Sequence, residues 1–143
     1  MGYHFKLEAL RQFRQFTEER LQKELALAQR VLEQSEAILN DSIAKREKTE
    51  AAFRQTPQAP LAGMYRHFLE RVAEDITLQS SKVQAARTAC EEKRDELLTA
   101  MKKRKTLDRL KEKGQQAFTA DLNGAEEKFV NEIALNRYTR KSG

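Results

Sequence analysis

The sequence contains no tryptophan, one cysteine, two prolines and five glycines. A single cysteine cannot form a disulfide within the chain, so the fold must hold without one, as in a reducing compartment. Scarce proline and glycine leave long stretches in which nothing interrupts a helix. Aromatic residues make up only 7% of the chain, which argues against a wide core with an enclosed pocket.

Long apolar runs are also missing. No stretch approaches the roughly eighteen apolar residues that span a membrane, and the residues that follow Met1 do not resemble a signal peptide. We therefore expect a soluble protein in which any membrane contact goes through a partner.

What the chain has in abundance is charge, at 34% of its residues, arranged around a regular apolar pattern. From 62 to 107, positions spaced alternately by three and four residues are mostly apolar. This period of 3.5 predicts a helix that supercoils against a partner helix. The fourteen seam positions are Ala62, Tyr65, Leu69, Val72, Ile76, Gln79, Val83, Ala86, Cys90, Lys93, Leu97, Ala100, Arg104 and Leu107.

A second register runs through the first part of the chain. Its ten positions are Leu21, Leu25, Ala28, Leu32, Ser35, Leu39, Ser42, Arg46, Thr49 and Phe53. Upstream, the apolar pattern predicts that Leu7, Leu10, Phe13 and Thr17 continue the seam. This requires two successive steps of four at Leu21, a stutter that locally unwinds the supercoil.

The two registers are separated by a short break with prolines at 57 and 60. A break of this length joins antiparallel helices, so we expect residue i to face a residue near 118 minus i. The predicted fold is all-α, a single long antiparallel two-helix coiled-coil hairpin. Its parts are a helix at about 4–55, a turn at 56–60, a second helix at about 61–113, and a tail at 114–143 that is helical or frayed.

The tail begins at Gly114, where the first helix has no residues left to pair with. A weaker apolar stripe follows at Phe118, Leu122, Ala125, Phe129 and Ile133. The tail is therefore either a free overhang or a surface for another molecule.

The sequence offers no plausible catalytic constellation. His4, His67 and Cys90 lie far apart in the predicted hairpin, and no glycine-rich phosphate loop is present. We expect a protein that is not an enzyme, with no catalytic residues, no cofactor and no metal site.

Basic residues concentrate between 101 and 113, where seven basic and two acidic residues give the same surplus of five as the whole chain. This surplus favours an acidic partner at that end, although a solvated helix face would look the same. No aromatic residues interleave with the basic ones, so we expect no nucleic-acid binding. A nucleic-acid-binding coiled coil, the alternative, predicts retention of DNA or RNA that falls steeply with salt.

One aromatic residue falls beside the seam near the predicted turn. Phe68 lies between the seam positions Tyr65 and Leu69. It is either an exposed anchor for a partner protein or a residue that packs over the turn against Phe53 and Leu61.

The chain resembles the FliJ family, the small coiled-coil component of the flagellar type III export apparatus. The resemblance rests on the order of four segments, and it departs from the family at Asn131, where another acidic residue is usual. The segments are Phe5-Lys6-Leu7-Glu8-Ala9-Leu10 with Arg11 and Arg14, Met64-Tyr65-Arg66-His67-Phe68-Leu69, Lys102 to Lys113, and Glu132-Ile133-Ala134-Leu135-Asn136-Arg137-Tyr138.

The resemblance implies a non-enzymatic stalk in the cytoplasm, associated with the inner membrane through the export apparatus. Its implied partners are the export ATPase hexamer, the cytoplasmic domain of the export gate protein and export chaperones. The gate-facing residues would be Tyr65, Phe68 and Val72. The ATPase-facing residues would be Arg104, Arg109, Lys111, Arg137 and Tyr138. The alternatives are the homologous stalk of a virulence-type secretion system and a generic coiled-coil scaffold.

Overall fold

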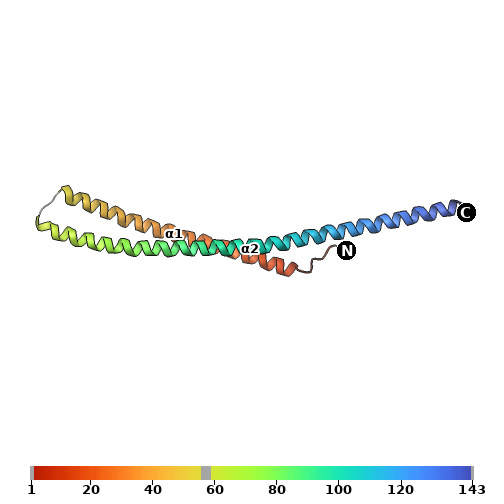
Figure 1. Cartoon of the computed structure of the whole chain (residues 1–143), viewed down its shortest axis with the longest axis horizontal. Helices are drawn as coiled ribbons and strands as arrows, with labels where there is room; N and C mark the ends of the chain where they lie inside the picture. The colour runs from red at the N-terminus through yellow and green to blue at the C-terminus, as the bar shows by residue number, and fades with distance from the viewer. Residues whose placement is uncertain (1, 56–58, 143) are drawn as a thin grey trace. The chain divides into compact units, whose positions relative to one another are not determined.

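The structure, a computed structural model, describes residues 2–55 and 59–142. Within these ranges the chain forms two helices, α1 (Glu8–Gln55) and α2 (Ala59–Ser142), and no strand (Figure 1). The predicted all-α fold of two long helices packed against each other is thus confirmed. Residues 56–58 of the predicted turn lie outside the described part of the chain.

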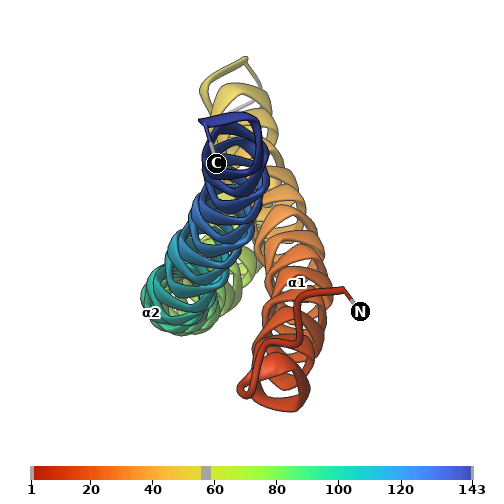
Figure 2. The ribbon, with the colours of Figure 1, turned by 90° about the vertical axis from the view of Figure 1, so that its right-hand side faces the viewer.

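The helix ends follow from local chemistry. A turn precedes α1, in which the Glu8 amide donates a hydrogen bond to the Phe5 carbonyl oxygen at 3.1 Å, so the helix begins at Glu8 after a short non-helical lead (Figure 2, red). Pro60 lies in the first turn of α2, where its missing amide hydrogen costs nothing. Basic residues close both helices, at Arg54 and at Arg140 with Lys141, beside the negative end of the helix dipole.

The chain divides into two compact units. Unit 1 comprises Met1–Glu18 and Ala100–Gly143, and unit 2 comprises Glu19–Thr99. In each unit, part of α1 packs against part of α2. Between the helices of unit 2, Ser42 Oγ donates to Asp75 Oδ2 at 2.6 Å and Lys93 Nζ lies 3.0 Å from Glu24 Oε2.

These contacts confirm the predicted antiparallel pairing. The residue numbers of the interhelical polar pairs sum to between 117 and 123 in unit 2, and to between 119 and 122 in unit 1. The expected sum was near 118, give or take one helical turn, and the pair of Arg87 with Glu36, at 123, lies slightly outside it.

The seam of α2 also lies where the heptad register places it. All fourteen predicted positions from Ala62 to Leu107 are buried or half-buried. Within that range, Met101 is the one other described residue that is not exposed. The buried apolar side chains are Leu21, Val72, Val83, Ala86 and Cys90 in unit 2, and Ala100 and Leu107 in unit 1.

The register of α1 is confirmed from Leu21 to Phe53, where all ten predicted positions are buried or half-buried. The prediction upstream of Leu21 is wrong for three of its four positions, whereas Thr17 is half-buried as predicted. Leu7, Leu10 and Phe13 are exposed. The seam instead continues without a stutter, and its positions there are occupied by Glu18, Arg14 and Arg11.

Helix α2 passes through Gly114 without a break. The glycine has a packing role, because a Cβ atom at this position would lie 1.9 Å from the Tyr3 hydroxyl oxygen. The Tyr3 ring also packs against Phe118, with 5.8 Å between ring centroids. The non-helical lead therefore extends the contact with α2 past the point where α1 begins.

Candidate partner-binding surfaces

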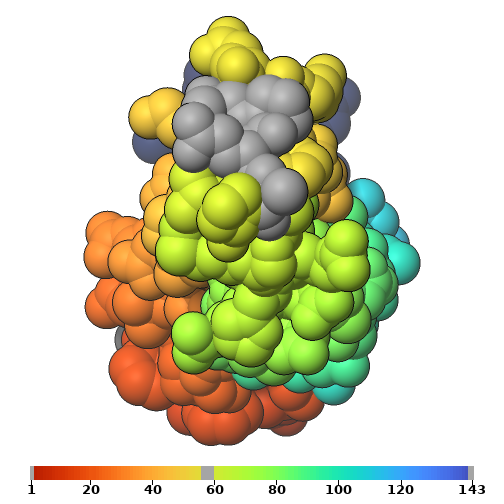
Figure 3. Space-filling view, turned by 90° about the vertical axis from the view of Figure 1, so that its left-hand side faces the viewer, coloured from red at the N-terminus to blue at the C-terminus, as the bar shows by residue number. Residues whose placement is uncertain are grey.

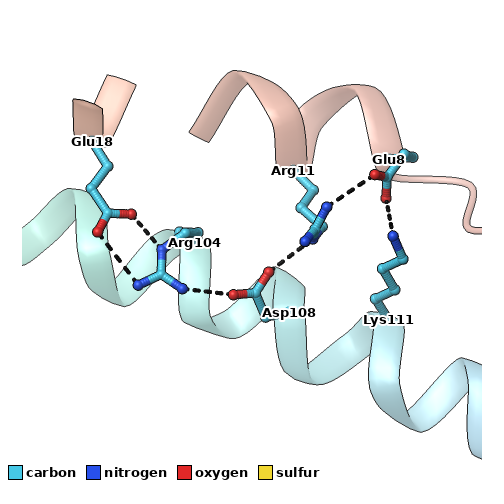
Figure 4. Close-up of polar contacts among 6 residues, drawn as sticks. All are labelled: Glu8, Arg11, Glu18, Arg104, Asp108 and Lys111. Carbon is cyan, nitrogen blue, oxygen red and sulfur yellow. Dashed lines mark hydrogen bonds and ion pairs between the residues drawn. The ribbon is translucent and has the colours of Figure 1, made fainter. Parts of the chain in front are cut away.

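Charged side chains occupy the seam of unit 1 and form a continuous network between its two helices (Figure 4). Seam positions normally take apolar residues, so a charged side chain there needs a partner of opposite sign. The six members are Glu8, Arg11 and Glu18 of α1 and Arg104, Asp108 and Lys111 of α2.

Asp108 lies in the middle of this network. It accepts from Arg11 Nε at 2.8 Å with one oxygen and from Arg104 Nη1 at 2.7 Å with the other. Arg104 in turn donates through Nε and Nη2 to the two carboxylate oxygens of Glu18, which is buried.

Glu8 closes the network at the start of α1. One of its oxygens lies 3.0 Å from Arg11 Nη1, and the other lies 3.1 Å from Lys111 Nζ. The charges alternate in sign along the whole path, so each is neutralised by its neighbours.

The network lowers the pKa of two of its carboxylates, Asp108 and Glu8. Burial raises the pKa of Asp108, but the hydrogen bonds from Arg11 and Arg104 outweigh this effect and leave the pKa below its ordinary value. The pKa of Glu8 is lowered chiefly by the Lys111 ammonium, with a smaller contribution from Arg11.

Two predicted ATPase-facing residues, Arg104 and Lys111, belong to this network, while Arg109 is exposed on α2. Arg137 and Tyr138 are also exposed and lie near the end of α2. The predicted residues of this group therefore fall into two places, the charged seam and the exposed surface of α2.

The apolar stripe in the tail of α2, residues 114–142, is largely exposed to solvent. Leu122, Phe129 and Ile133 are exposed, and Phe118 is half-buried beneath Tyr3. The stripe therefore presents apolar surface to solvent over much of the tail.

The three predicted gate-facing residues lie in unit 2, where α1 ends and α2 begins (Figure 3, yellow and yellow-green). Tyr65 packs against Phe53 with 5.3 Å between ring centroids. Val72 is buried in the seam, whereas Phe68 is 44% exposed. Phe68 lines a shallow pocket together with Thr49, Met64 and Tyr65.

The structure thus favours one of the two interpretations of Phe68. The Phe53 ring has Tyr65 as its aromatic neighbour, and Phe68 keeps much of its surface in contact with solvent. Of the three predicted residues, Phe68 is the most exposed, while Tyr65 is half-buried against Phe53 and Val72 is buried between the helices.

Sequence reasoning missed the acidic members of the network, Glu8, Glu18 and Asp108. A signal was present, because the register of α1 extended backwards from Leu21 without a slip gives Glu18, Arg14 and Arg11 in sequence. Pairing near a sum of 118 then places these residues opposite the basic segment of α2.

No group of three His, Cys, Asp or Glu side chains that could hold a metal ion occurs among the described residues. Neither α1 nor α2 contains, in its described part, a segment apolar enough to cross a membrane.

Comparison with known proteins identifies a family but no individual relative. No curated protein and no solved structure was found to match the chain. The family model described as the flagellar FliJ protein matches residues 3–143. The chain therefore belongs to the FliJ family, a family of non-catalytic proteins associated with flagellar protein export.

Proposed function

We propose that this protein is a stalk-like coupling subunit of the flagellar type III export apparatus. In this proposal, unit 1 binds the export ATPase and promotes its hexamer, and the Phe68 end of unit 2 binds the cytoplasmic domain of the export gate. The protein also escorts export chaperones. It acts in the cytoplasm and reaches the inner membrane with the export apparatus.

The observation that supports two separate partners is the difference in surface chemistry between the units. Unit 1 exposes a run of basic side chains on α2, including Lys102, Lys103 and Arg109. Unit 2 exposes an aromatic side chain, Phe68, beside a shallow pocket. Basic surfaces favour acidic partners, whereas exposed aromatic side chains are typical anchors of protein interfaces.

The ATPase contact is tested by measuring ATP hydrolysis and hexamer formation by the cognate export ATPase with and without this protein. We expect both to rise, because a bound stalk stabilises the assembled ring by mass action. An Arg109→Glu variant should lose most of the effect, whereas Arg94→Glu, which reverses an exposed charge in unit 2, should retain it. No change in hydrolysis or assembly with the wild-type protein would rule out this part of the proposal.

The gate contact is tested with Phe68→Ala. Truncating a partly exposed aromatic anchor should weaken binding to the gate domain by about tenfold and leave the helicity intact. Leu98→Ala, which removes an exposed apolar side chain elsewhere in unit 2, is the matched control. Loss of helicity in the Phe68 variant, measured by circular dichroism, would instead identify Phe68 as a packing residue.

A further inference from the structure

An apolar ridge runs along α1 in unit 1. Its members are Leu10, Phe13 and Phe16, and the two phenylalanines are 58% and 63% exposed. They face solvent because Arg11, Arg14 and Glu18 take the neighbouring seam positions of α1. The Arg14 guanidinium lies over the Phe13 ring, 5.9 Å from its centroid, so the ridge carries positive charge beside an aromatic face.

Helix α2 contributes to the same side of unit 1. Leu110 occupies the heptad position that flanks the seam in α2, as Leu10 does in α1, and antiparallel coiled coils bring these flanking positions together. Their residue numbers also fit the observed pairing of unit 1. Leu110 is 46% exposed, so α2 adds an exposed apolar side chain to unit 1.

The charge around this apolar surface is strongly positive, because the seam network sequesters acidic side chains. Glu8, Glu18 and Asp108 all point into that network. Among residues 6–18 and 100–113, the exposed ionisable side chains are six basic and one acidic, Glu112. The six basic residues are Lys6, Lys102, Lys103, Lys105, Arg109 and Lys113.

We propose that the ridge and its basic surroundings bind directly to the surface of an anionic lipid bilayer. A helix with exposed Phe and Leu side chains beside Lys and Arg lies in the bilayer interface, with the apolar side chains among the acyl chains and the basic groups at the lipid phosphates. This inference goes beyond the proposed export function and does not depend on it.

The direct test is flotation of the full-length protein with vesicles. Vesicles of phosphatidylcholine mixed with phosphatidylglycerol should carry the protein upwards, whereas vesicles of phosphatidylcholine alone should not. Phe13→Ser with Phe16→Ser should reduce binding by about tenfold or more, because two partly inserted rings are lost. Leu78→Ser with Leu98→Ser removes comparably exposed side chains from unit 2 and should leave binding unchanged.

A second measurement separates insertion from simple charge attraction. The chain has no tryptophan, so Phe13→Trp introduces a single fluorescent probe. Its emission should shift to the blue on anionic vesicles and should not shift with heparin, which supplies negative charge without acyl chains. Leu98→Trp should show no shift with either.

Two results would overturn the proposal. One is equal binding to neutral and anionic vesicles. The other is anionic binding that survives the double Phe substitution and is matched by heparin, which would make the surface a general polyanion site. Circular dichroism of each variant verifies that the helices remain folded.

Discussion

The carboxylate of Asp108 links the two helices of unit 1. One of its oxygens accepts a hydrogen bond from Arg11 on α1, and the other accepts one from Arg104 on α2. Its lowered pKa means that the folded protein favours the ionised form more than the unfolded chain does. That stability is fully present above the ordinary carboxyl pKa and is lost as the pH falls through the lower value of the folded state.

We therefore expect the free energy of unfolding to decline as the pH drops below the ordinary carboxyl range. Asp108→Asn should be less stable than the wild type at neutral pH, and the difference should shrink in acid as the wild-type carboxylate becomes protonated. Urea unfolding followed by circular dichroism at a series of pH values measures both curves. A constant difference across the series would show that Asp108 acts through packing rather than charge.

At Gly114, helix propensity and packing favour different residues. Alanine favours a helix over glycine by about 1 kcal/mol, but its Cβ atom would collide with the Tyr3 hydroxyl. Since that hydroxyl is the end of a flexible side chain, the lead should move rather than α2. Gly114→Ala should therefore stabilise the protein by about 1 kcal/mol in a Tyr3→Ala background and by less in the wild type.

The comparison of these variants by urea unfolding forms a double-mutant cycle. An identical gain in both backgrounds would mean that Tyr3 and residue 114 are not energetically coupled. Loss of the Tyr3 to Phe118 ring contact in Gly114→Ala is visible in proton NMR spectra of the aromatic region.

At the scale of the elements, hydrophobic periodicity was sufficient to predict the seam positions wherever most of them are apolar. It located every seam position from Ala62 to Leu107 and from Leu21 to Phe53. It failed at Leu7, Leu10 and Phe13 because the side chains that fit the opposite helix there are charged. The pattern of apolar residues followed Leu10 and Phe13, whereas the pairing energy favoured Arg11 and Glu18 facing Asp108 and Arg104.

The residues of the candidate sites were likewise predictable from the sequence only in part. Phe68 was identifiable because an aromatic residue beside a seam has no place within it. The Tyr3 contact with Gly114 could not be predicted, since it depends on where a non-helical lead lies on α2. The basic segment was visible in sequence, but its division into network members and exposed residues required the pairing partners.

At the start of α1 the seam contains an ion pair, Glu18 with Arg104 of α2. Replacing both members of a partly buried ion pair with apolar residues is often stabilising by about 1 to 4 kcal/mol, whereas removing one member leaves a charge without its partner. Glu18→Leu with Arg104→Leu should therefore raise the free energy of unfolding, and Glu18→Leu alone should lower it. If the single variant were as stable as the double, the ion pair would have no energetic role in the pairing of these helices.

For the molecule as a whole, the two units are held by different physical forces. Unit 2 buries apolar side chains from both helices, among them Leu21, Val72 and Val83. In unit 1, the described part of α1 contributes only Glu18 to the buried set, and its apolar residues are exposed. Salt screens charges that are partly exposed to solvent and has little effect on apolar burial.

Rising salt should therefore loosen unit 1 before unit 2. Amide hydrogen exchange of the full-length protein, followed by mass spectrometry, should show faster exchange in residues 8–18 as sodium chloride increases, because local opening exposes their backbone amides. Exchange near Val83 and Cys90, where the seam is apolar and buried, should change little. The Glu18→Leu with Arg104→Leu variant supplies the control, since an apolar pair in the same place should reduce the salt dependence of residues 8–18. Equal acceleration in both units would mean that their pairing relies on charge to the same extent, against the division of forces inferred from burial.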